Sequence, residues 1–204
     1  MDPAHPLGLE LPAFGADPLA ALAAWLEAAR AGGEPEPAAM ALATVTAAGE
    51  PQVRMVLLKR VDARGLTFFS NYRSDKGRQL AAVPRAAVAL FWPGLHRQVR
   101  CSGAVGRTPR AESLAYFSTR PYGAQVSAAI SPQSRPVPSR GWLEERSRVH
   151  AARHPDTVPL PAGWGGYRLR PDRVEFWQGR PDRLHDRLRF TRAEGGWQGE
   201  RLAP

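Results

Sequence analysis

Between residues 39 and 107 the apolar residues recur at every second position, and this alternation constrains the fold more than any other feature of the chain. A period of two is typical of half-buried β-strands, whose side chains point to opposite faces in turn. It predicts strands over residues 39–46, 52–59, 66–70, 86–92 and 97–107. Turn sequences lie between them at Gly49-Glu50, 62–65 and Pro93-Gly94. Strands joined by such short turns pair antiparallel, so we expect a mainly β protein with flanking helices, closed into a barrel rather than a βαβ sheet.

Helical segments flank and interrupt these strands. Asp17-Pro18 opens the first helix, with Asp as N-cap and Pro in the first turn, and Gly32-Gly33 ends it. Further helices are predicted over 74–82, 108–119 and 139–153, and strands resume at Trp164 and end in a hairpin through Gly195-Gly196. Residues 1–16 are rich in Pro, Gly and Ala and are expected to form a flexible lead-in. Residues 17–204 are expected to form one domain.

The formal net charge of +9 indicates an anionic partner. Nucleic acid is the general candidate, but the arginines are spread over the whole chain and the aromatic residues do not interleave with them, so small anionic ligands are favoured. No apolar run approaches the roughly 18 residues that cross a bilayer, and the first residues lack a hydrophobic signal core. We therefore expect a cytoplasmic protein without a membrane partner. With a single cysteine, Cys101, and five histidines without clustered carboxylates, no metal site is expected.

Residues 174–187 place several cations close together in the sequence. Alternation predicts a strand through Phe176 and Trp177, the stretch 179–182 is a turn, and a returning strand would present Arg183, His185 and Arg187 on one face. Like charges on one face repel unless an anion lies among them. The pattern indicates either a solvated basic face or the wall of a pocket for a phosphorylated or carboxylated ligand.

Three other motifs allow similar pairs of interpretations. Arg54 and Lys59 stand at opposite ends of an apolar strand. They are either charged ends that keep the strand soluble, or contacts to two different ligands. Lys76 lies where a strand leads into a helix N-terminus, which is a potential phosphate site or an ordinary capped turn. Tyr116 and Arg120 share one helix face, suited to a phosphate dianion or to simple stacking. Gln98 and the pair Gln133-Ser134 are neutral groups that can bond a flavin edge or local backbone.

These motifs together resemble the pyridoxine/pyridoxamine 5′-phosphate oxidase family. The resemblance runs from about residue 17 to the C-terminus. It is carried by the following stretches, in this order: Arg54–Lys59, Ser70-Asn71, Lys76–Arg78, Arg97–Arg100, Tyr116-Phe117, Arg120-Pro121, Ser131–Ser134, Trp164–Gly166, Glu175–Gly179, Arg183–Arg187 and Glu200–Pro204.

The resemblance implies an FMN-binding split β-barrel and a homodimer with FMN held between the subunits. It implies FMN contacts at Arg54, Met55, Val56, Leu57, Leu58, Lys59, Phe69, Ser70, Lys76, Gln98, Gln133, Ser134, Trp177 and Arg187. It implies substrate contacts at Lys59, Tyr116, Arg120, Arg183, Leu184 and His185, with Arg183 and His185 flanking the pyridine ring as catalytic residues. The implied reaction is oxidation of pyridoxamine or pyridoxine 5′-phosphate to pyridoxal 5′-phosphate, with O₂ as acceptor and H₂O₂ as product.

Two positions depart from the family pattern. Asp75 stands where the family usually has an arginine near the FMN phosphate, and Ala124 stands where a serine usually assists the substrate phosphate. Two alternative functions therefore stay open. One is a related flavin oxidase acting on another substrate, such as a phenazine precursor, and the other is a non-catalytic flavin-binding protein.

Overall fold

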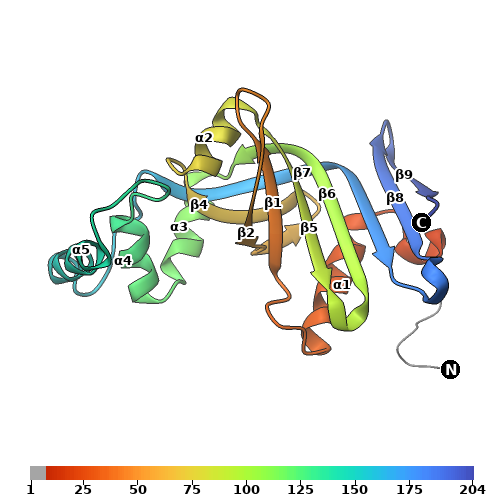
Figure 1. Ribbon diagram of the computed structural model, residues 1–204, viewed down its shortest axis with the longest axis horizontal. Coiled ribbons are helices and arrows are strands. Elements are labelled where there is room, and N and C mark those ends of the chain that lie inside the picture. The colour runs from red at the N-terminus through yellow and green to blue at the C-terminus, as the bar shows by residue number, and fades with distance from the viewer. Residues whose placement is uncertain (1–7) are drawn as a thin grey trace.

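The computed structural model describes residues 8–204, and an antiparallel sheet of nine strands forms its centre (Figure 1). The strands are β1 Ala39–Val45, β2 Pro51–Leu57, β3 Arg60–Asp62, β4 Gly65–Asn71, β5 Arg85–Trp92, β6 Arg97–Arg107, β7 Trp164–Gln178, β8 Asp186–Ala193 and β9 Gly196–Arg201. Their order is β2-β1-β5-β6-β7-β4-β3, with β8 paired to β7 and β9 to β8. Every pair is antiparallel, as the short turns predict.

The sheet curls without closing. The end strands of its path, β2 and β3, follow one another in the chain, but within the described residues no ladder joins them. The fold is therefore an antiparallel split barrel: the predicted strand pairing is confirmed, whereas full closure is not found. The predicted strand over 52–59 ends at Leu57, because the backbone turns at Leu58 and Lys59 to begin β3.

The concave side of the sheet holds the main core. Residues of β1 and β5 alternate between buried and partly exposed, as a two-residue period requires. The helix α1, Pro18–Ala31, lays Leu19, Leu22 and Leu26 against this side. Asp17 caps α1 by accepting a hydrogen bond from the Leu19 amide at 2.9 Å, as predicted.

The remaining helices lie mostly beyond one end of the sheet (Figure 1). They are α2 Asp75–Ala82, α3 Arg110–Ser118, α4 Tyr122–Ile130 and α5 Arg140–Arg153. Helices α3 to α5 surround a second, smaller core of Phe117, Val126, Val158 and Trp164. Helix α4 was not predicted: Pro121 marks a break after the expected helix 108–119, but proline is also common at the start of helices.

The expectation of a flexible lead-in over residues 1–16 needs correction in its second half. Residues 1–7 lie outside the described residues, but Leu9 and Phe14 are buried in the main core. The Phe14 ring lies 4.6 Å from that of Phe176, and the Leu9 amide donates to the Asp186 carboxylate at 3.2 Å. The prediction used the overall content of Pro, Gly and Ala and did not consider two large apolar side chains, Leu9 and Phe14, which pack in the core.

Among residues 8–204, no helix is long and apolar enough to span a membrane.

Candidate functional site

One cavity between β2, β4 and α3, of about 500 Å³, gathers residues from several of the predicted motifs. We call it the β4–α3 cavity. Its lining includes the predicted residues Met55, Val56, Leu57, Lys59, Phe69, Ser70, Lys76, Tyr116, Arg120 and Gln133, and Thr119, Pro121 and Trp164 complete it. The lining contains three cations and no carboxylate, so the cavity is suited to an anionic ligand.

The N-terminus of α2 brings Lys76 to this cavity. Ser74 caps the helix by accepting from the Gly77 amide at 3.3 Å. Gln133 Oε1 accepts from Ser70 Oγ at 3.2 Å and from Lys76 Nζ at 3.3 Å, so one amide oxygen holds both side chains. Burial lowers the pKa of Lys76, and the nearby charge of Arg54 lowers it further. An anion in the cavity would relieve this repulsion.

Arg54 and Leu58 do not line the β4–α3 cavity, although residues next to them do. The Arg54 guanidinium donates to Thr44 Oγ1 and, at 3.0 Å, to Gln79 Oε1, so it is held beside α2 and does not line the cavity. Burial lowers its pKa as well. Leu58 is 1% exposed and belongs to the core, so its side chain is not available to a ligand. Ser134 follows Gln133 in an exposed turn with a left-handed φ of 66° and also lies outside the lining.

Helix α3 and the residues just after it supply Tyr116 and Arg120. The Tyr116 ring stacks on Phe69 with centroids 4.0 Å apart, and Lys59 Nζ lies 5.9 Å from the centre of the Tyr116 ring. Arg120 Nη1 is buried and has no hydrogen-bond partner. Burial lowers the pKa of Arg120, an effect that Tyr116 opposes. A buried guanidinium nitrogen without an acceptor is rare in proteins and points to a ligand that supplies one.

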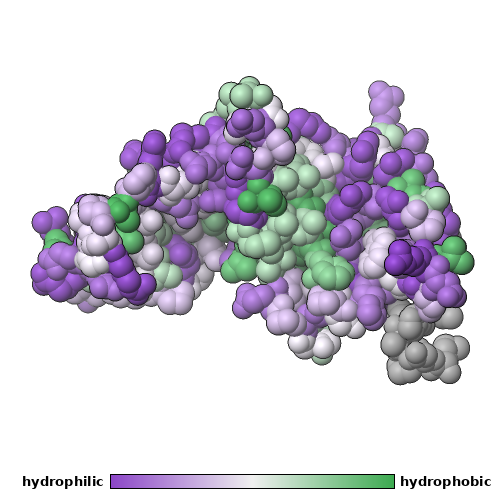
Figure 2. All heavy atoms as spheres, in the orientation of Figure 1, coloured by the Kyte–Doolittle hydropathy of each residue, from purple (hydrophilic) through white to green (hydrophobic). Residues whose placement is uncertain are grey.

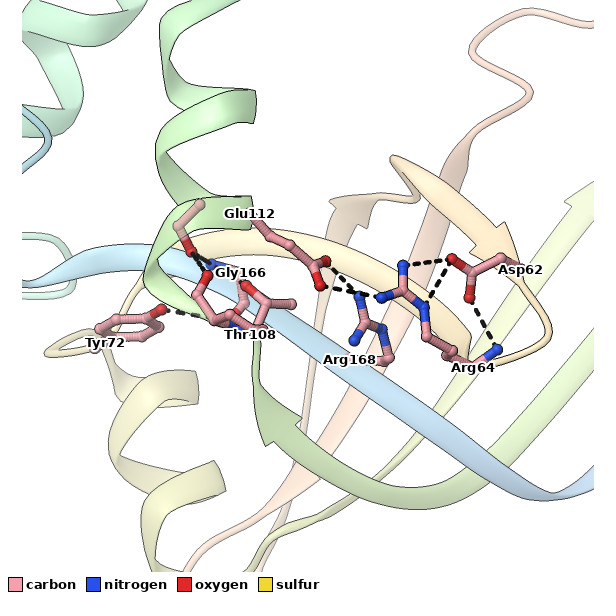
Figure 3. A network of polar contacts seen from close by, with 9 residues as sticks. Asp62, Arg64, Tyr72, Thr108, Glu112, Gly166 and Arg168 are labelled. Carbon is pink, nitrogen blue, oxygen red and sulfur yellow. Dashed lines mark hydrogen bonds and ion pairs between the residues drawn. The ribbon is translucent and has the colours of Figure 1, made fainter.

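A polar network fixes the start of α3 against the sheet (Figure 3). Ser113 Oγ accepts from the Gly166 amide at 3.0 Å and lies 3.1 Å from Thr108 Oγ1. The Glu112 carboxylate accepts from Arg168 at 2.5 Å and from Arg64 at 3.1 Å. These bonds tie α3 to β7 and to the turn before β4, and so set the position of Tyr116 one helical turn further on.

The other predicted residues form a second group at the far end of β7. Gln98 on β6 pairs with Trp177 on β7, and Trp177 pairs with Arg187 on β8. The Trp177 and His185 rings lie 4.8 Å apart between centroids. Trp164 and Trp177 are the first and the last but one residue of β7, on the order of 40 Å apart along an extended strand. Within one chain, this group and the β4–α3 cavity are separate.

The turn before β8 differs from its prediction. Arg183 and His185 do not lie on the returning strand, because Pro181–Arg183 forms a 3-10 turn and β8 begins at Asp186. Asp182 and Arg183 adopt left-handed φ values of 57° and 61°, a costly conformation for residues other than glycine. The Arg180 amide donates to His185 Nδ1 at 3.0 Å, which ties the ring to the turn. Leu184 is 72% exposed.

An anion within the protein, Glu175, neutralises part of the positive charge predicted for this stretch. Glu175 accepts from Arg187 at 3.0 Å and from Arg100 at 2.7 Å. Burial favours the protonated form of Glu175, but the hydrogen bonds from the two arginines outweigh it and keep the pKa of its carboxyl below the usual range. Neither sequence interpretation included this internal ion pair, although Glu175 precedes the cations in the same stretch.

The convex side of the sheet carries an apolar face that reaches toward both groups. Its large members are Val53, Met55 and Leu57 on β2 and Phe91 on β5, with Ala41, Ala43, Ala87 and Ala89 between them. Figure 2 shows green atoms gathered over β1, β2 and β5. Met55 and Leu57 border the β4–α3 cavity, and Phe91 pairs with Gln98 of the second group. We call this set the convex apolar face.

The two departures from the family pattern lie near the cavity without lining it. Asp75 forms an ion pair with Arg78 one turn along α2, and its side chain is about half exposed. Ala124 lies in the first turn of α4, where its amide donates to the Pro121 carbonyl at 2.9 Å. Trp164 was not predicted as a lining residue, because the motif Trp164-Gly165-Gly166 contains no local signal that assigns the ring to a site.

Comparison with protein families gives two matches that together span most of the chain. Residues 26–148 match a family described as pyridoxamine 5′-phosphate oxidase. Residues 164–204 match the pyridoxine 5′-phosphate oxidase C-terminal dimerisation region. The chain is also 53% identical over 191 residues to the pyridoxine/pyridoxamine 5′-phosphate oxidase of Bordetella avium, covering 93% of this chain and 90% of that protein. It is 55% identical over 170 residues to the enzyme of the same name from Azotobacter vinelandii, covering 83% and 79%.

Solved structures show the same architecture. PhzG from Burkholderia lata 383, in complex with tetrahydrophenazine-1-carboxylic acid, superposes with a TM-score of 0.91 at 30% identity over 96% of this chain and 98% of its own. A pyridoxamine 5′-phosphate oxidase-related, FMN-binding protein from Nostoc punctiforme superposes with a TM-score of 0.72 at 21% identity, covering 91% and 96%. The second likeness concerns the fold alone.

Proposed function

The chain belongs to the pyridoxine/pyridoxamine 5′-phosphate oxidase family, and from this premise we propose that it oxidises pyridoxine and pyridoxamine 5′-phosphate to pyridoxal 5′-phosphate with FMN as cofactor. The observation that carries the substrate assignment is the convergence of Lys59, Tyr116 and Arg120 on one cavity, with Arg120 Nη1 lacking an acceptor. An ammonium, a hydroxyl and a guanidinium together match a phosphate dianion.

The residues near α2 are suited to hold FMN. Arg54 and Lys76 are cations whose pKa values are both lowered by burial, and each would be stabilised by the FMN phosphate. The N-terminus of α2 adds unpaired amide donors and a favourable dipole. Ser70 and Gln133 offer polar groups beside them. Bound FMN would supply the redox chemistry: two electrons and two protons would leave the substrate and reduce O₂ to H₂O₂.

In this mechanism the chain's own residues bind and orient the substrate. Lys59, Tyr116 and Arg120 hold the phosphate, which fixes the distance of the reacting carbon from the cavity wall. Arg183 and His185 would flank the pyridine ring. Both follow the end of β7 that lies away from the cavity, so in this proposal a second copy of the chain supplies them.

A homodimer through the convex apolar face supports this arrangement. The match of residues 164–204 to a dimerisation region indicates self-association, and the face joins the cavity edge at Met55 to the second group at Gln98. A two-fold interface presents the same patch on both copies, so one copy's second group can meet its partner's cavity.

Steady-state oxidation of pyridoxamine 5′-phosphate against pyridoxamine tests the function. Hydrogen bonds to charged groups contribute about 1.5–3 kcal/mol each, so two surviving contacts predict at least about 100-fold higher kcat/KM for the phosphorylated amine. Formation of pyridoxal 5′-phosphate with equimolar H₂O₂ is the expected result. Equal kcat/KM for the two amines would refute the phosphate site.

The structural likeness to PhzG supports a second candidate, an oxidase of tetrahydrophenazine-type acids. Such an acid carries a carboxylate and no phosphate. Turnover of tetrahydrophenazine-1-carboxylic acid, without turnover of pyridoxamine 5′-phosphate, would favour this candidate.

A further inference from the structure

We propose that Trp164 is a positioning residue for the substrate phosphate, because the face of its indole ring holds the Arg120 guanidinium in the β4–α3 cavity. The guanidinium carbon of Arg120 lies 4.8 Å from the centre of the Trp164 ring. The inference rests on the proposed function, since it takes Arg120 as a phosphate-binding residue. It adds a residue that acts through Arg120.

The surroundings of Arg120 explain why an aromatic face matters. No carboxylate in residues 8–204 pairs with Arg120, and its other ring neighbour is Phe117, with the guanidinium carbon 5.7 Å from the ring centre. A carboxylate would occupy the N–H donors that a phosphate needs. A ring attracts the cation through its π-face and leaves the N–H groups in the guanidinium plane unused. This accounts for a buried Nη1 without a partner.

The Trp164 ring is itself held in place by other rings. It is 6% exposed and lies nearly parallel to Phe69, at 5.5 Å and 14°, and to Tyr116, at 6.2 Å and 10°. Phe117 meets it edge-on at 5.1 Å. The ring therefore contacts both Arg120 and Tyr116, two of the three residues assigned to the phosphate, and a change in its position would move both.

The backbone at Trp164 is clamped from α3. Arg110 Nη1 donates to the Trp164 carbonyl at 3.1 Å and to the Pro161 carbonyl at 3.0 Å, and Nη2 donates to the Leu160 carbonyl at 2.6 Å. The two glycines that follow let β7 pack closely against its neighbours. A Cβ at Gly165 would lie 2.0 Å from Tyr72 Oη and 2.8 Å from Ser113 Oγ on α3, and one at Gly166 would lie 2.4 Å from Thr108 Oγ1. The Trp-Gly-Gly sequence thus seats the indole ring against α3.

The variant Trp164→Leu removes the aromatic face and keeps an apolar side chain. We expect KM for pyridoxamine 5′-phosphate to rise about tenfold, the fold-change typical of a partly buried cation–π contact, with kcat changed less than about twofold. Unphosphorylated pyridoxamine is the matched control, and its kcat/KM should stay the same. Inorganic phosphate as a competitive inhibitor should lose affinity by a similar factor, which gives a binding readout independent of turnover.

A merely structural role for Trp164 would give a different pattern. Trp164→Phe keeps a smaller aromatic face and is expected to recover most of the affinity for phosphate. If Trp164→Leu fails to fold, Trp164→Phe tests the role of Trp164 instead. Equal losses of kcat/KM toward the phosphorylated and unphosphorylated amines would then overturn the inference. In an Arg120→Gln background, which removes the cation that the ring holds, Trp164→Leu should have little further effect on KM.

The outcomes separate this inference from the proposed function. A wild-type protein that treats both amines alike refutes the phosphate site and with it the proposed function. A wild-type protein that prefers the phosphorylated amine, with Trp164→Leu showing an unchanged preference, refutes the role of Trp164 alone.

Discussion

At the scale of single residues, arginines with a carboxylate partner differ from arginines without one. Arg187 and Arg100 share the buried Glu175, whereas Arg120 pairs with no carboxylate among residues 8–204 and lies against the rings of Trp164 and Phe117. An arginine paired with Glu175 is neutralised inside the protein. An arginine beside aromatic rings keeps N–H groups that can donate hydrogen bonds to a ligand. The sequence shows only that all three are arginines, so it predicts basic motifs but not which of them are already neutralised.

The Glu175 ion pair predicts an acid-sensitive stability. The pKa of Glu175 is lower in the folded protein than in the unfolded chain, so its contribution is complete above the ordinary glutamate pKa and is lost as pH falls through the folded value. Glu175→Gln should lower the free energy of unfolding at pH 7 by about 3 kcal/mol, because two arginines lose a buried partner. Denaturant unfolding at pH 7 and pH 4 measures this.

The same comparison supplies the control for Glu175. Between pH 7 and pH 4, wild type should lose more stability than Glu175→Gln. Glu200→Gln, which removes an exposed partner of Arg189, should behave as wild type does. Parallel losses of stability in wild type and Glu175→Gln would contradict the assignment.

The anion beside the proposed FMN phosphate gives a second residue-scale prediction. Asp75 lies next to Lys76 and its charge acts on both Lys76 and Arg54, but its ion pair with Arg78 and its half-exposed side chain reduce the effect. Asp75→Arg should tighten FMN binding by about 1 kcal/mol, or roughly fivefold. Titration of the apoprotein with FMN at low and high salt measures this, with Asp75→Asn as the intermediate charge. Unchanged or weaker binding of FMN to Asp75→Arg would mean that the side chain points away from the phosphate.

At the scale of elements, the period of the apolar residues predicts most strands well. The predicted strand 97–107 coincides with β6, and 39–46 overruns β1 by one residue. The prediction fails where tertiary contacts decide: β3 is only three residues long, and α4 begins at a proline-marked break. The lining of the β4–α3 cavity could be predicted only through the resemblance, because no local pattern shows that residues 59, 76 and 116 meet.

The bulge between β6 and β7 depends on a glycine. The register shifts between Ser102 and Gly103, and a Cβ at Gly103 would lie 2.1 Å from the Arg170 carbonyl oxygen, where the backbone cannot easily move. Gly103→Ala should therefore destabilise the protein by about 3 kcal/mol. Gly106→Ala in the same strand is the matched control, since the nearest atom to its Cβ is the end of the Arg170 side chain at 4.0 Å. Thermal unfolding measures both variants. Equal melting temperatures would show that the backbone of β7 can move away from the added Cβ at little cost, against this prediction.

At the scale of the whole molecule, the two groups of predicted site residues lie at opposite ends of β7. The long strand β7 carries Trp164 at the cavity and Trp177 at the other end, and a curled sheet keeps these ends apart. The sequence places both motifs in one chain but contains no signal for the distance between them. Under the proposed function, a second copy of the chain completes the site, and the convex apolar face is the surface through which we propose that the two copies meet.

The last prediction concerns this assembly. Phe91 is 57% exposed in the single chain and lies on the convex apolar face beside Gln98, so a charge there would be buried without a partner in a dimer. Phe91→Glu should shift the protein to monomers and weaken FMN binding more than tenfold, because the second group would no longer reach the cavity. Leu114→Glu is the control, since Leu114 is 50% exposed on α3, outside that face. Light scattering and FMN titration measure the two variants. A monomeric Phe91→Glu that still binds FMN with wild-type affinity would show that one chain suffices.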